Sequence, residues 1–403
     1  MEGEILCPRP FWEELLREGL HPQAEERTFW APAGLAWRPE RIRLLVRGPF
    51  QAGRPAGPGP VLRVSFRSGR PASPVETLGE LGGGELILGR GPAEGRWAGW
   101  IRRPGGPPLP IREILLPGPG MFRMAAGPEP GPWREPELRA RWSRTRGALG
   151  EAPWRRLTDL RVGLIGGGRL GSTLAVALAR NGVRGLVLVD PDRVELHNIG
   201  EGEGYGEDDL GRPKVEALAR HLAETCPWTH VEAIPFPVER WAALHALKLC
   251  DLLICTADTA SGRVAAGELS ALYLLPLIEA GTGVFASPAG DRRLGLEVRL
   301  ILPWEVCRPC LEEGPEGDPG ALTPWWADRM GSLRSLNLTA AGLTLMLLEG
   351  FICEEVTRST AWVWTRDQGF RAEALAHPCG RAGCLRRRLG VGDAVFDSIA
   401  PPD

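Results

Sequence analysis

A glycine turn, an acid and a lysine follow one another in the middle of the chain, in an order that suits contact with a phosphorylated ligand. The turn, 166–171 (Gly-Gly-Gly-Arg-Leu-Gly), follows the apolar segment 162–165, and the next apolar segment, 186–189, ends at Asp190. Backbone N–H groups of such a turn can approach a phosphate, and an acid at that place suits a ribose hydroxyl. The turn alone is typical of a dinucleotide fold. The segment 209–214 (Asp-Leu-Gly-Arg-Pro-Lys), which begins 19 residues after the acid, is a feature that a dinucleotide fold does not require.

The lysine at the end of that segment is informative because the chain otherwise uses arginine. Lys214 and Lys248 are the only lysines among 48 basic residues. The compact ammonium group of lysine can reach a phosphate without the planar fork of arginine. The alternative is a solvated lysine on a helix that starts near Pro213, since most isolated helix charges merely face water. We interpret Lys214 as a cation that contacts a ligand.

Length and charge narrow the class of protein. At 403 residues the chain is long enough for two domains, each with its own core. Its net charge of −2 gives no overall basic field, so nucleic acid is not an expected partner. The longest apolar stretch, about 338–348, is short and interrupted, and no membrane span is expected. The N-terminus lacks the features of a signal peptide, and we expect a cytoplasmic location.

Two regions of the chain differ in their pattern of expected secondary structure. Residues 1–135 alternate short strand-like segments with Gly/Pro-rich turns, which is typical of a small α+β domain, and 126–132 is a candidate linker. Residues 136–403 alternate strands with helices, which predicts an α/β fold with a Rossmann-like, doubly wound, mostly parallel sheet. The expected strands are 41–46, 61–66, 85–88, 111–116, 162–165, 186–189, 231–236, 252–255, 277–280 and 296–302. The expected helices lie near 174–182, 213–226, 239–249, 261–273 and 337–355.

Several further motifs occur around the glycine turn in a definite order. In chain order they are Arg141-Trp142-Ser143-Arg144, the glycine turn, Asp190-Pro191-Asp192, Asn198, the segment 209–214, Cys255-Thr256-Ala257-Asp258, Arg263 and two cysteine pairs. With these motifs, about residues 139–384 resemble the ubiquitin-activating and ThiF/MoeB-type adenylyltransferase family. The resemblance implies an ATP-dependent adenylation domain that works as a homodimer.

By this resemblance the matched positions have expected roles. The implied nucleotide contacts are Gly166, Gly168, Gly171, Asp190, Asn198, Lys214 and Asp258. Asp190 would hold the ATP ribose, while Asn198 and Lys214 would contact the phosphates or the reacting carboxylate. Asp258 would lie near the α-phosphate and hold Mg²⁺, and Arg144 would reach ATP across a dimer interface. An acyl-adenylate forms when a carboxylate attacks an α-phosphate, so Lys214, Asp258 and Arg144 are the candidate catalytic residues.

The resemblance also implies a substrate. It is the C-terminal carboxylate of a ubiquitin-like or sulfur-carrier protein that ends in glycine. Activation of a tRNA or small-peptide carboxylate by the same chemistry is an alternative. A nicotinamide- or flavin-dependent oxidoreductase is another, because it explains the glycine turn and Asp190 equally well. It leaves the cysteine pairs and Arg144 without a role.

Two positions depart from the family pattern. The fourth place of Gly-x-Gly-Gly-x-Gly is Arg169, and the phosphate-binding arginine of Asn-x-x-Arg is replaced by Glu201. Arg193 and Arg169 are the nearby candidates to compensate for the lost arginine, but nothing in the sequence shows that either does so. A degenerate, non-catalytic scaffold that binds a ubiquitin-like partner is therefore a further alternative.

Four of the nine cysteines form two close pairs. These are Cys307 with Cys310 and Cys379 with Cys384. Four thiolates on two tight turns suit a structural Zn²⁺, with His377 as an alternative ligand and a set of reduced, unliganded thiols as the other reading. The segment 311–336 contains no cysteine, and Cys353 lies in an apolar helical stretch where its thiol pKa would be raised. We therefore expect adenylation without a built-in thioester step.

The N-terminal region carries little functional information. The segment 83–89 faintly resembles the opening strand of JAB-type isopeptidases. Such an enzyme needs a His-x-His pair and an acid to hold its metal, but His21 is the only histidine before residue 197, so an active metalloprotease is excluded. An inactive JAB-like domain and an unrelated substrate-recognition domain both stay open.

Overall fold

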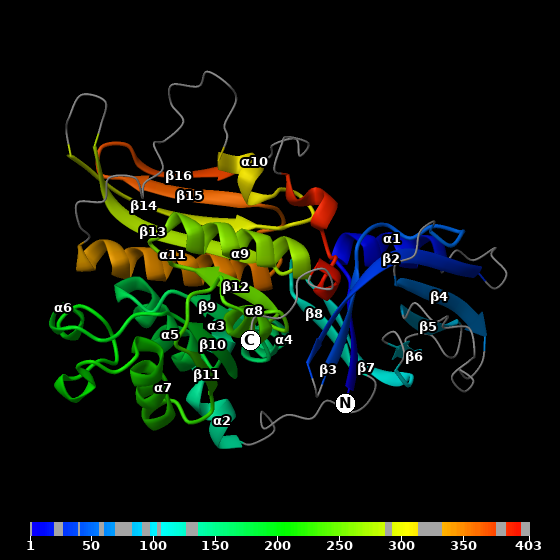
Figure 1. Cartoon of the computed structure of the whole chain (residues 1–403), viewed down its shortest axis with the longest axis horizontal. Coiled ribbons are helices and arrows are strands. Elements are labelled where there is room, and N and C mark those ends of the chain that lie inside the picture. The colour runs from blue at the N-terminus through cyan, green and yellow to red at the C-terminus, as the bar shows by residue number, and fades with distance from the viewer. Residues whose placement is uncertain are drawn as a thin grey trace. The chain divides into compact units, whose positions relative to one another are not determined.

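The computed structural model divides the chain into two compact units (Figure 1). Unit 1 comprises Met1–Pro132, Leu272–Leu274 and Arg388–Asp403, and unit 2 comprises Trp133–Ala271 and Leu275–Arg387. The described residues are 2–19, 27–38, 41–55, 60–68, 83–90, 97–102, 106–125, 136–286, 292–312, 333–375 and 384–395. The linker expected at 126–132 lies outside them, as do Cys379 and His377.

Unit 2 is built on an eight-stranded sheet with the strand order β11-β10-β9-β12-β13-β14-β15-β16. Its strands are β9 (Arg161–Ile165), β10 (Gly185–Val189), β11 (His230–Ile234), β12 (Leu252–Cys255), β13 (Leu277–Ala286), β14 (Arg292–Ile301), β15 (Thr360–Thr365) and β16 (Gly369–Ala374). The four pairings from β11 to β13 are parallel, and the three from β13 to β16 are antiparallel. The result is a mostly parallel α/β sheet with an antiparallel extension.

Helices connect the parallel strands. They are α5 (Arg169–Arg180), α6 (Leu196–Ile199), α7 (Lys214–Thr225), α8 (Trp241–Leu247) and α9 (Ala260–Tyr273), preceded by α2 (Pro136–Arg141), α3 (Ser143–Leu149) and α4 (Glu151–Thr158) and followed by α10 (Arg308–Glu312) and α11 (Arg334–Ile352). Strand β9 lies between β10 and β12, so the order of the parallel strands reverses at β9. In open α/β sheets, ligands bind outside the carboxyl ends of the strands at such a reversal.

The alternation of strands and helices predicted the Rossmann-like sheet, and that prediction is confirmed. All four residues of β12 are buried, as expected for a strand of a parallel sheet covered on both faces. The antiparallel part was only partly anticipated. Strands β15 and β16 form a hairpin after a long helix, and their short mixed segments give too weak a periodic signal to be recognised.

Helix α11 has the length expected from the sequence, but it begins and ends three residues earlier, at Arg334 and Ile352. It has 19 residues, and its mean hydropathy reaches 1.4, so by length and composition alone it could cross a membrane. However, 56% of its most apolar window is buried inside the protein. It packs against α5, β13 and β14 and runs alongside the sheet in Figure 1. A core helix of a globular protein passes the same test, so this single helix is weak evidence for a membrane span.

In its described residues, unit 1 contains an eight-stranded sheet and the α-helix α1 (Arg9–Gly19). Its strands are β1 (Glu2–Leu6), β2 (Arg27–Arg38), β3 (Arg41–Val46), β4 (Val61–Ser68), β5 (Gly83–Arg90), β6 (Trp97–Arg102), β7 (Leu109–Leu116) and β8 (Phe122–Ala125). The order is β1-β3-β2-β4-β5-β6-β7-β8, and β1 also pairs with β7. Because β1 pairs with both β3 and β7, the strands from β1 to β7 form a closed ring of pairings around one apolar core. The four strands expected here are present, and the function of the unit stays a prediction.

Candidate active site

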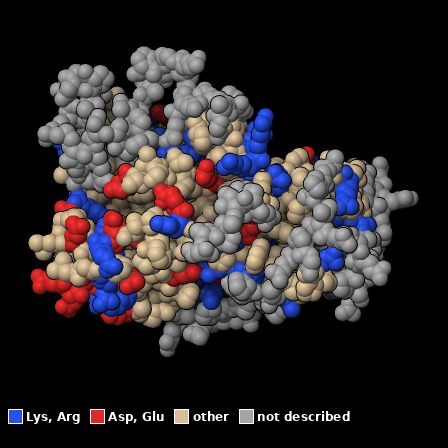
Figure 2. Space-filling model, in the orientation of Figure 1, with Lys and Arg blue, Asp and Glu red and all other residues tan. Residues whose placement is uncertain are grey.

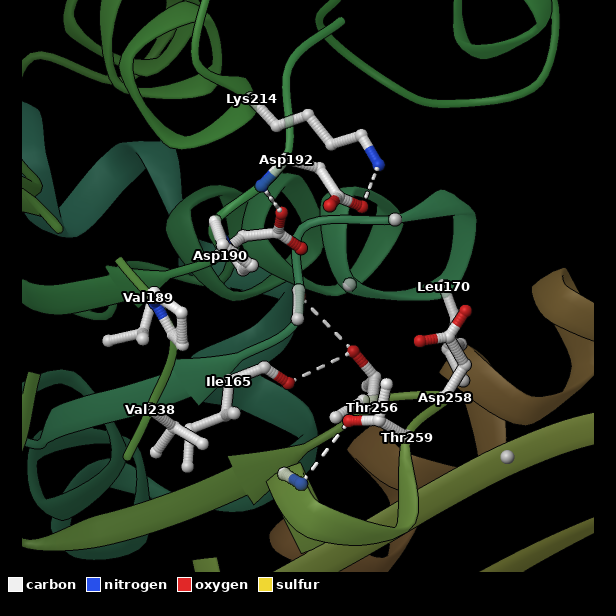
Figure 3. Close-up of a pocket in the computed structure, with 18 of the residues that line it drawn as sticks. Ile165, Leu170, Val189, Asp190, Asp192, Lys214, Val238, Thr256, Asp258 and Thr259 are labelled. Atoms are coloured by element: carbon white, nitrogen blue, oxygen red, sulfur yellow. Dashed lines mark hydrogen bonds and ion pairs between the residues drawn. The ribbon is translucent and has the colours of Figure 1, made fainter. Parts of the chain in front are cut away.

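A pocket of unit 2 lies at the carboxyl ends of β9, β10 and β12, where the strand order reverses (Figure 3). Its volume is about 270 Å³, near the lower end of the range for small-molecule sites. Charged side chains of both signs line it, namely Asp190, Asp192, Glu239, Asp258, Arg169 and Lys214. The three glycines expected to approach a nucleotide, Gly166, Gly168 and Gly171, line it as well.

The glycine turn needs its glycines for close packing and for an open approach. Gly166 has φ of +101°, and a Cβ there would lie 2.6 Å from the Thr256 Oγ1. A Cβ on Gly171 would lie 1.9 Å from the Gly166 carbonyl oxygen. A Cβ on Gly168 would meet nothing within 4 Å, so this side of the turn is open. The N-terminus of α5 therefore presents backbone N–H groups to the pocket, an arrangement that favours an anion.

Asp190 and Tyr205 hold the turn in place. The Gly167 N–H donates to Asp190 Oδ2 at 2.6 Å, and the Asp192 N–H donates to Asp190 Oδ1 at 2.8 Å. The Tyr205 hydroxyl donates to the Gly167 carbonyl at 2.5 Å. Burial raises the pKa of Asp190, whereas its two backbone hydrogen bonds oppose the rise. A carboxylate has about four lone-pair sites, so Asp190 retains acceptor capacity for a hydroxyl.

Lys214 is a buried pocket residue rather than a solvated helix charge. It is the first residue of α7 and is 7% exposed. Its Nζ lies 2.8 Å from Asp192 Oδ2, and the Asp192 side chain is 64% exposed. Figure 3 shows this pair on one side of the pocket and Asp258 on another. Because Asp192 is largely in water, the pair can be rearranged at modest cost when an anion enters.

Asp258 lies just beyond the end of β12, in an exposed position on the pocket wall. The segment before it is fixed from two directions. Thr256 Oγ1 donates to the Gly166 carbonyl at 3.1 Å, and Arg263 Nε donates to the Ala257 carbonyl at 2.8 Å. Arg263 itself is 1% exposed, and burial lowers its pKa. Arg263 thus fixes the position of the segment after β12, and Asp258, the next residue, lines the pocket.

The two departures from the family pattern contact each other. Arg169, the first residue of α5, forms an ion pair with Glu201 through Nη2 and Oε2. Arg169 lines the pocket, whereas Glu201 lies outside the set of lining residues. Arg193, the other candidate for compensation, donates to the Gly211 carbonyl at 2.8 Å and does not line the pocket.

Two expected site residues are not brought to this pocket. Asn198 caps the short helix α6, where its Oδ1 accepts the Glu195 N–H at 2.9 Å. Arg144 is exposed on α3 and is not a lining residue. Its neighbour Trp142 is anchored by a hydrogen bond to the Arg180 carbonyl and by packing on Trp154. The roles expected for Asn198 and Arg144 stay predictions.

Three of the four paired cysteines come together in unit 2. The sulfur atoms of Cys307, Cys310 and Cys384 lie within 4.8 Å of one another, and Cys307 Sγ is 3.8 Å from Cys384 Sγ. A tetrahedral Zn²⁺ with Zn–S bonds of about 2.3 Å requires sulfur atoms about 3.8 Å apart. The three thiols therefore fit a zinc site, and the fourth expected ligand, Cys379, lies outside the described residues.

A buried charge network connects this cysteine cluster to the pocket. Arg308, between Cys307 and Cys310, has its Nε 2.7 Å from Glu279 Oε1. Glu279 Oε2 lies 3.8 Å from Arg263 Nη1, and all three side chains are at most 3% exposed. Since Arg263 also binds the Ala257 carbonyl, the network runs from the cysteine turn to the residue before Asp258.

Cys353 lies at the end of the apolar helix, whereas the sequence predicted a position inside it. It follows α11 as the C-cap instead of lying inside the helix, because the helix ends at Ile352. Its thiol is partly exposed, and its pKa is raised, first by desolvation and then by nearby acids. The direction expected for its pKa is confirmed. A raised thiol pKa disfavours the thiolate that thioester formation requires.

Sequence reasoning missed several pocket residues. Val238 and Glu239 follow β11, and Asn337 reaches the pocket from α11. The Thr282 hydroxyl and the Asn337 Oδ1, 2.9 Å apart, link β13 to that helix. Asn337 is one of several polar residues in this mainly apolar helix, so its type alone did not single it out.

The comparisons with known proteins agree with this geometry. A model of the ThiF family matches residues 142–289. The SAMP-activating enzyme E1 of Haloferax volcanii is 28% identical over 168 residues, which are 41% of this chain and 58% of the relative. The sulfur carrier protein ThiS adenylyltransferase of Escherichia coli is 29% identical over 157 residues, which are 39% of this chain and 59% of the relative. The chain thus spans somewhat more than half the length of each of these two relatives.

A shorter match involves an enzyme with a different kind of substrate in its name. The tRNA threonylcarbamoyladenosine dehydratase 2 of Saccharomyces cerevisiae is 36% identical over 86 residues, 21% of this chain and 19% of the relative. Among solved structures, the alignment with E. coli MccB in complex with ATP covers 63% of this chain and 76% of the MccB chain. The two are 20% identical in sequence, and the TM-score is 0.49. That structural similarity is too low to carry an argument. The family match at residues 142–289, together with the order of the motifs, shows that this chain contains a ThiF family domain.

Proposed function

We propose that this protein is an ATP-dependent adenylyltransferase that activates a carboxylate as an acyl-adenylate. The observation that carries the proposal is the convergence of Lys214 and Asp258, 44 residues apart in the chain, on one pocket at the N-terminus of α5. A helix N-terminus, a buried lysine and an exposed carboxylate together suit a magnesium–triphosphate group. A hydride-transfer enzyme would need neither the lysine nor Asp258.

The reaction requires charge neutralisation and alignment. A carboxylate oxygen of the substrate forms a bond to the α-phosphorus of ATP, the bond from that phosphorus to the bridging oxygen breaks, and pyrophosphate leaves. Both reactants are anions, so the site must offset their repulsion and hold the attacking oxygen in line. Lys214 would exchange its partner Asp192 for a phosphate oxygen, and Asp258 would hold Mg²⁺ near the α-phosphate.

The remaining pocket residues would fix the nucleotide. The open side of Gly168 would admit the phosphates, with Gly166 and Gly171 keeping the turn compact. Asp190 would accept a ribose hydroxyl. Magnesium, when bound, supplies Lewis-acid stabilisation of the departing pyrophosphate.

The proposed zinc site has a structural role. Cys307, Cys310 and Cys384, with Cys379, would hold Zn²⁺ in a closed set of four sulfur ligands. A closed site leaves no open position for catalysis. Its contribution would be to hold the turn that carries Arg308 against Glu279.

The proposed substrate is the C-terminal carboxylate of a ubiquitin-like or sulfur-carrier protein ending in glycine. The names of the H. volcanii and E. coli relatives support this class. The name of the yeast relative keeps a carboxylate on tRNA as the second candidate. Figure 2 shows basic and acidic side chains interspersed over the described face of unit 2, without a continuous basic surface on that face. We propose that the protein works as a homodimer in which Arg144 of one copy reaches the pocket of the other.

ATP–pyrophosphate exchange with Mg²⁺ tests the proposal. The purified protein would be combined with a panel of ubiquitin-like proteins ending in Gly-Gly, and with tRNA in a separate arm. Exchange that depends on one of these substrates supports adenylation and identifies the carboxylate. Exchange absent from every arm, together with no ATP binding by calorimetry, would favour the non-catalytic scaffold instead.

A further inference from the structure

An ion pair occupies the point where the pocket departs from its family pattern. Arg169 begins α5 and lines the pocket, and its Nη2 pairs with Glu201 Oε2. The Arg169 side chain is 21% exposed and that of Glu201 is 46% exposed. The two residues are 32 positions apart in the chain, so the fold, not local sequence, brings them together.

The charge balance of the pocket makes Arg169 important. The described lining residues include four carboxylates and two cations, namely Asp190, Asp192, Glu239 and Asp258 against Arg169 and Lys214. Lys214 is held by Asp192 at 2.8 Å. A polyphosphate entering this surplus of negative charge needs every available cation, in addition to its own metal.

The segment that carries Glu201 is fixed to two helices. The Glu203 N–H donates to the Ser172 Oγ on α5 at 3.0 Å. Arg334, the first residue of α11, pairs with Glu203 at 3.1 Å, and its Nη1 donates to the Glu201 carbonyl at 3.5 Å. Glu201 is therefore held at a defined place beside the first turn of α5.

We propose that Arg169 binds the polyphosphate of ATP in this protein and that Glu201 is a positioning residue that aims its guanidinium at the pocket. The inference rests on the proposed function and adds to it a phosphate-binding residue. A guanidinium carries five N–H donors in a planar fork, so it can hold a carboxylate and a phosphate at the same time. In this arrangement the arginine that the family pattern places at position 201 has been moved to position 169, and an acid at 201 now orients it.

The contact places positions 169 and 201 within side-chain reach of each other. The side chain at 201 reaches the guanidinium of residue 169, which lines the pocket. An arginine at 201 is longer than glutamate and would reach the same place from the opposite side. The double variant R169G/E201R restores the family pattern and should therefore restore phosphate binding.

Calorimetric binding of Mg·ATP to the full chain tests the proposal. We expect R169A to bind ATP about 10- to 100-fold more weakly than the wild type, the loss of one contact to a charged group. Adenosine, followed by ligand-observed NMR, should bind both proteins equally because it has no phosphate. R169G/E201R should recover most of the affinity for ATP. E201A should lose affinity by a smaller factor, and R180A, on the exposed end of the same helix, is the control with unchanged affinity.

The outcomes separate this inference from the proposed function. If the wild type binds ATP and R169A binds it equally well, the role of Arg169 is wrong and the adenylation proposal stands. Equal losses for ATP and adenosine in R169A would indicate a damaged pocket and would overturn the inference. E201A binding ATP as tightly as the wild type would overturn the positioning role of Glu201. If the wild type binds no ATP, both proposals fail.

Discussion

The pocket and the cysteine cluster place reactive groups in opposite environments within one domain. In the pocket, Asp192 is 64% exposed and Lys214 is held by an ion pair that can be rearranged. In the cluster, Cys307 and Cys310 are at most 4% exposed. Lys214 itself is buried, but Asp192, the partner that it would release, is largely in water, whereas two of the three thiols that would hold Zn²⁺ are closed off and the third, Cys384, is half-buried. The contrast therefore lies between a cation whose counterion can move into water and a cluster whose groups are mostly enclosed.

The two regions are not independent, because a buried network joins them. Arg308 belongs to the cysteine turn, Glu279 to β13, and Arg263 contacts the strand end before Asp258. Removing one partner of a buried ion pair leaves an uncompensated charge, which is strongly destabilising. The contrast between the regions predicts that pocket variants lose activity at constant stability and that cluster variants lose stability first.

The largest effect is expected from Asp258→Ala. Because Asp258 is exposed and would hold Mg²⁺ at the α-phosphate, its loss should lower the ATP–pyrophosphate exchange rate by roughly 100- to 1000-fold. The melting temperature should stay unchanged. Asp208→Ala, an exposed acid that does not line the pocket, is the matched control. Full exchange activity in Asp258→Ala would remove this residue from the proposed site.

Cys310→Ser should affect the other region. We expect the zinc content, measured by mass spectrometry under reducing conditions, to fall from about one per chain to near zero, with a lower melting temperature. Exchange activity at low temperature should fall less than in Asp258→Ala. Cys353→Ser, a partly exposed cysteine outside the cluster, should keep its zinc and its activity. A wild-type protein without zinc would contradict the structural-metal proposal.

Glu279→Gln tests the connection between the two regions and should have the smallest effect on chemistry. Arg263 and Arg308 would lose their shared counterion in a buried place, which should lower the free energy of unfolding by about 3 kcal/mol. Denaturant unfolding measures this loss, with the exposed Glu224→Gln as control. Zinc content and ATP affinity should both decline modestly in Glu279→Gln. An unchanged unfolding free energy would show that the network does not stabilise the fold, and unchanged zinc content and ATP affinity would show that it does not couple the cluster to the pocket.

Local patterns in the sequence predicted the centre of unit 2. The glycine turn and Asp190 belong to one βαβ unit, β9-α5-β10, which places them at the same sheet edge, and Lys214 begins the helix α7 that follows it, within about fifty residues of the turn. Asp258 could be placed because it ends an apolar strand of the same sheet. The pairing of Arg169 with Glu201 could not be predicted, since each residue taken alone appears as a departure from the pattern.

Contacts between distant segments account for the rest of what was missed. Asn337, on α11, lies about fifty residues beyond the end of β13, and no spacing rule connects it to the glycine turn. The hairpin of β15 and β16, and the return of β1 to β7 in unit 1, depend on pairings between strands whose short segments carry weak periodicity. Burial and long-range pairing decide such elements, and both appear only in the folded structure.

The identity of the products formed from ATP tests the central claim most directly. The full chain would be incubated with ATP labelled in the α-phosphate, Mg²⁺ and the panel of carriers ending in Gly-Gly, and the products separated. Attack of a carboxylate on the α-phosphorus predicts labelled AMP or acyl-adenylate together with pyrophosphate, in amounts that depend on one carrier. Labelled ADP with orthophosphate would place the attack at the γ-phosphorus and would contradict the adenylation account.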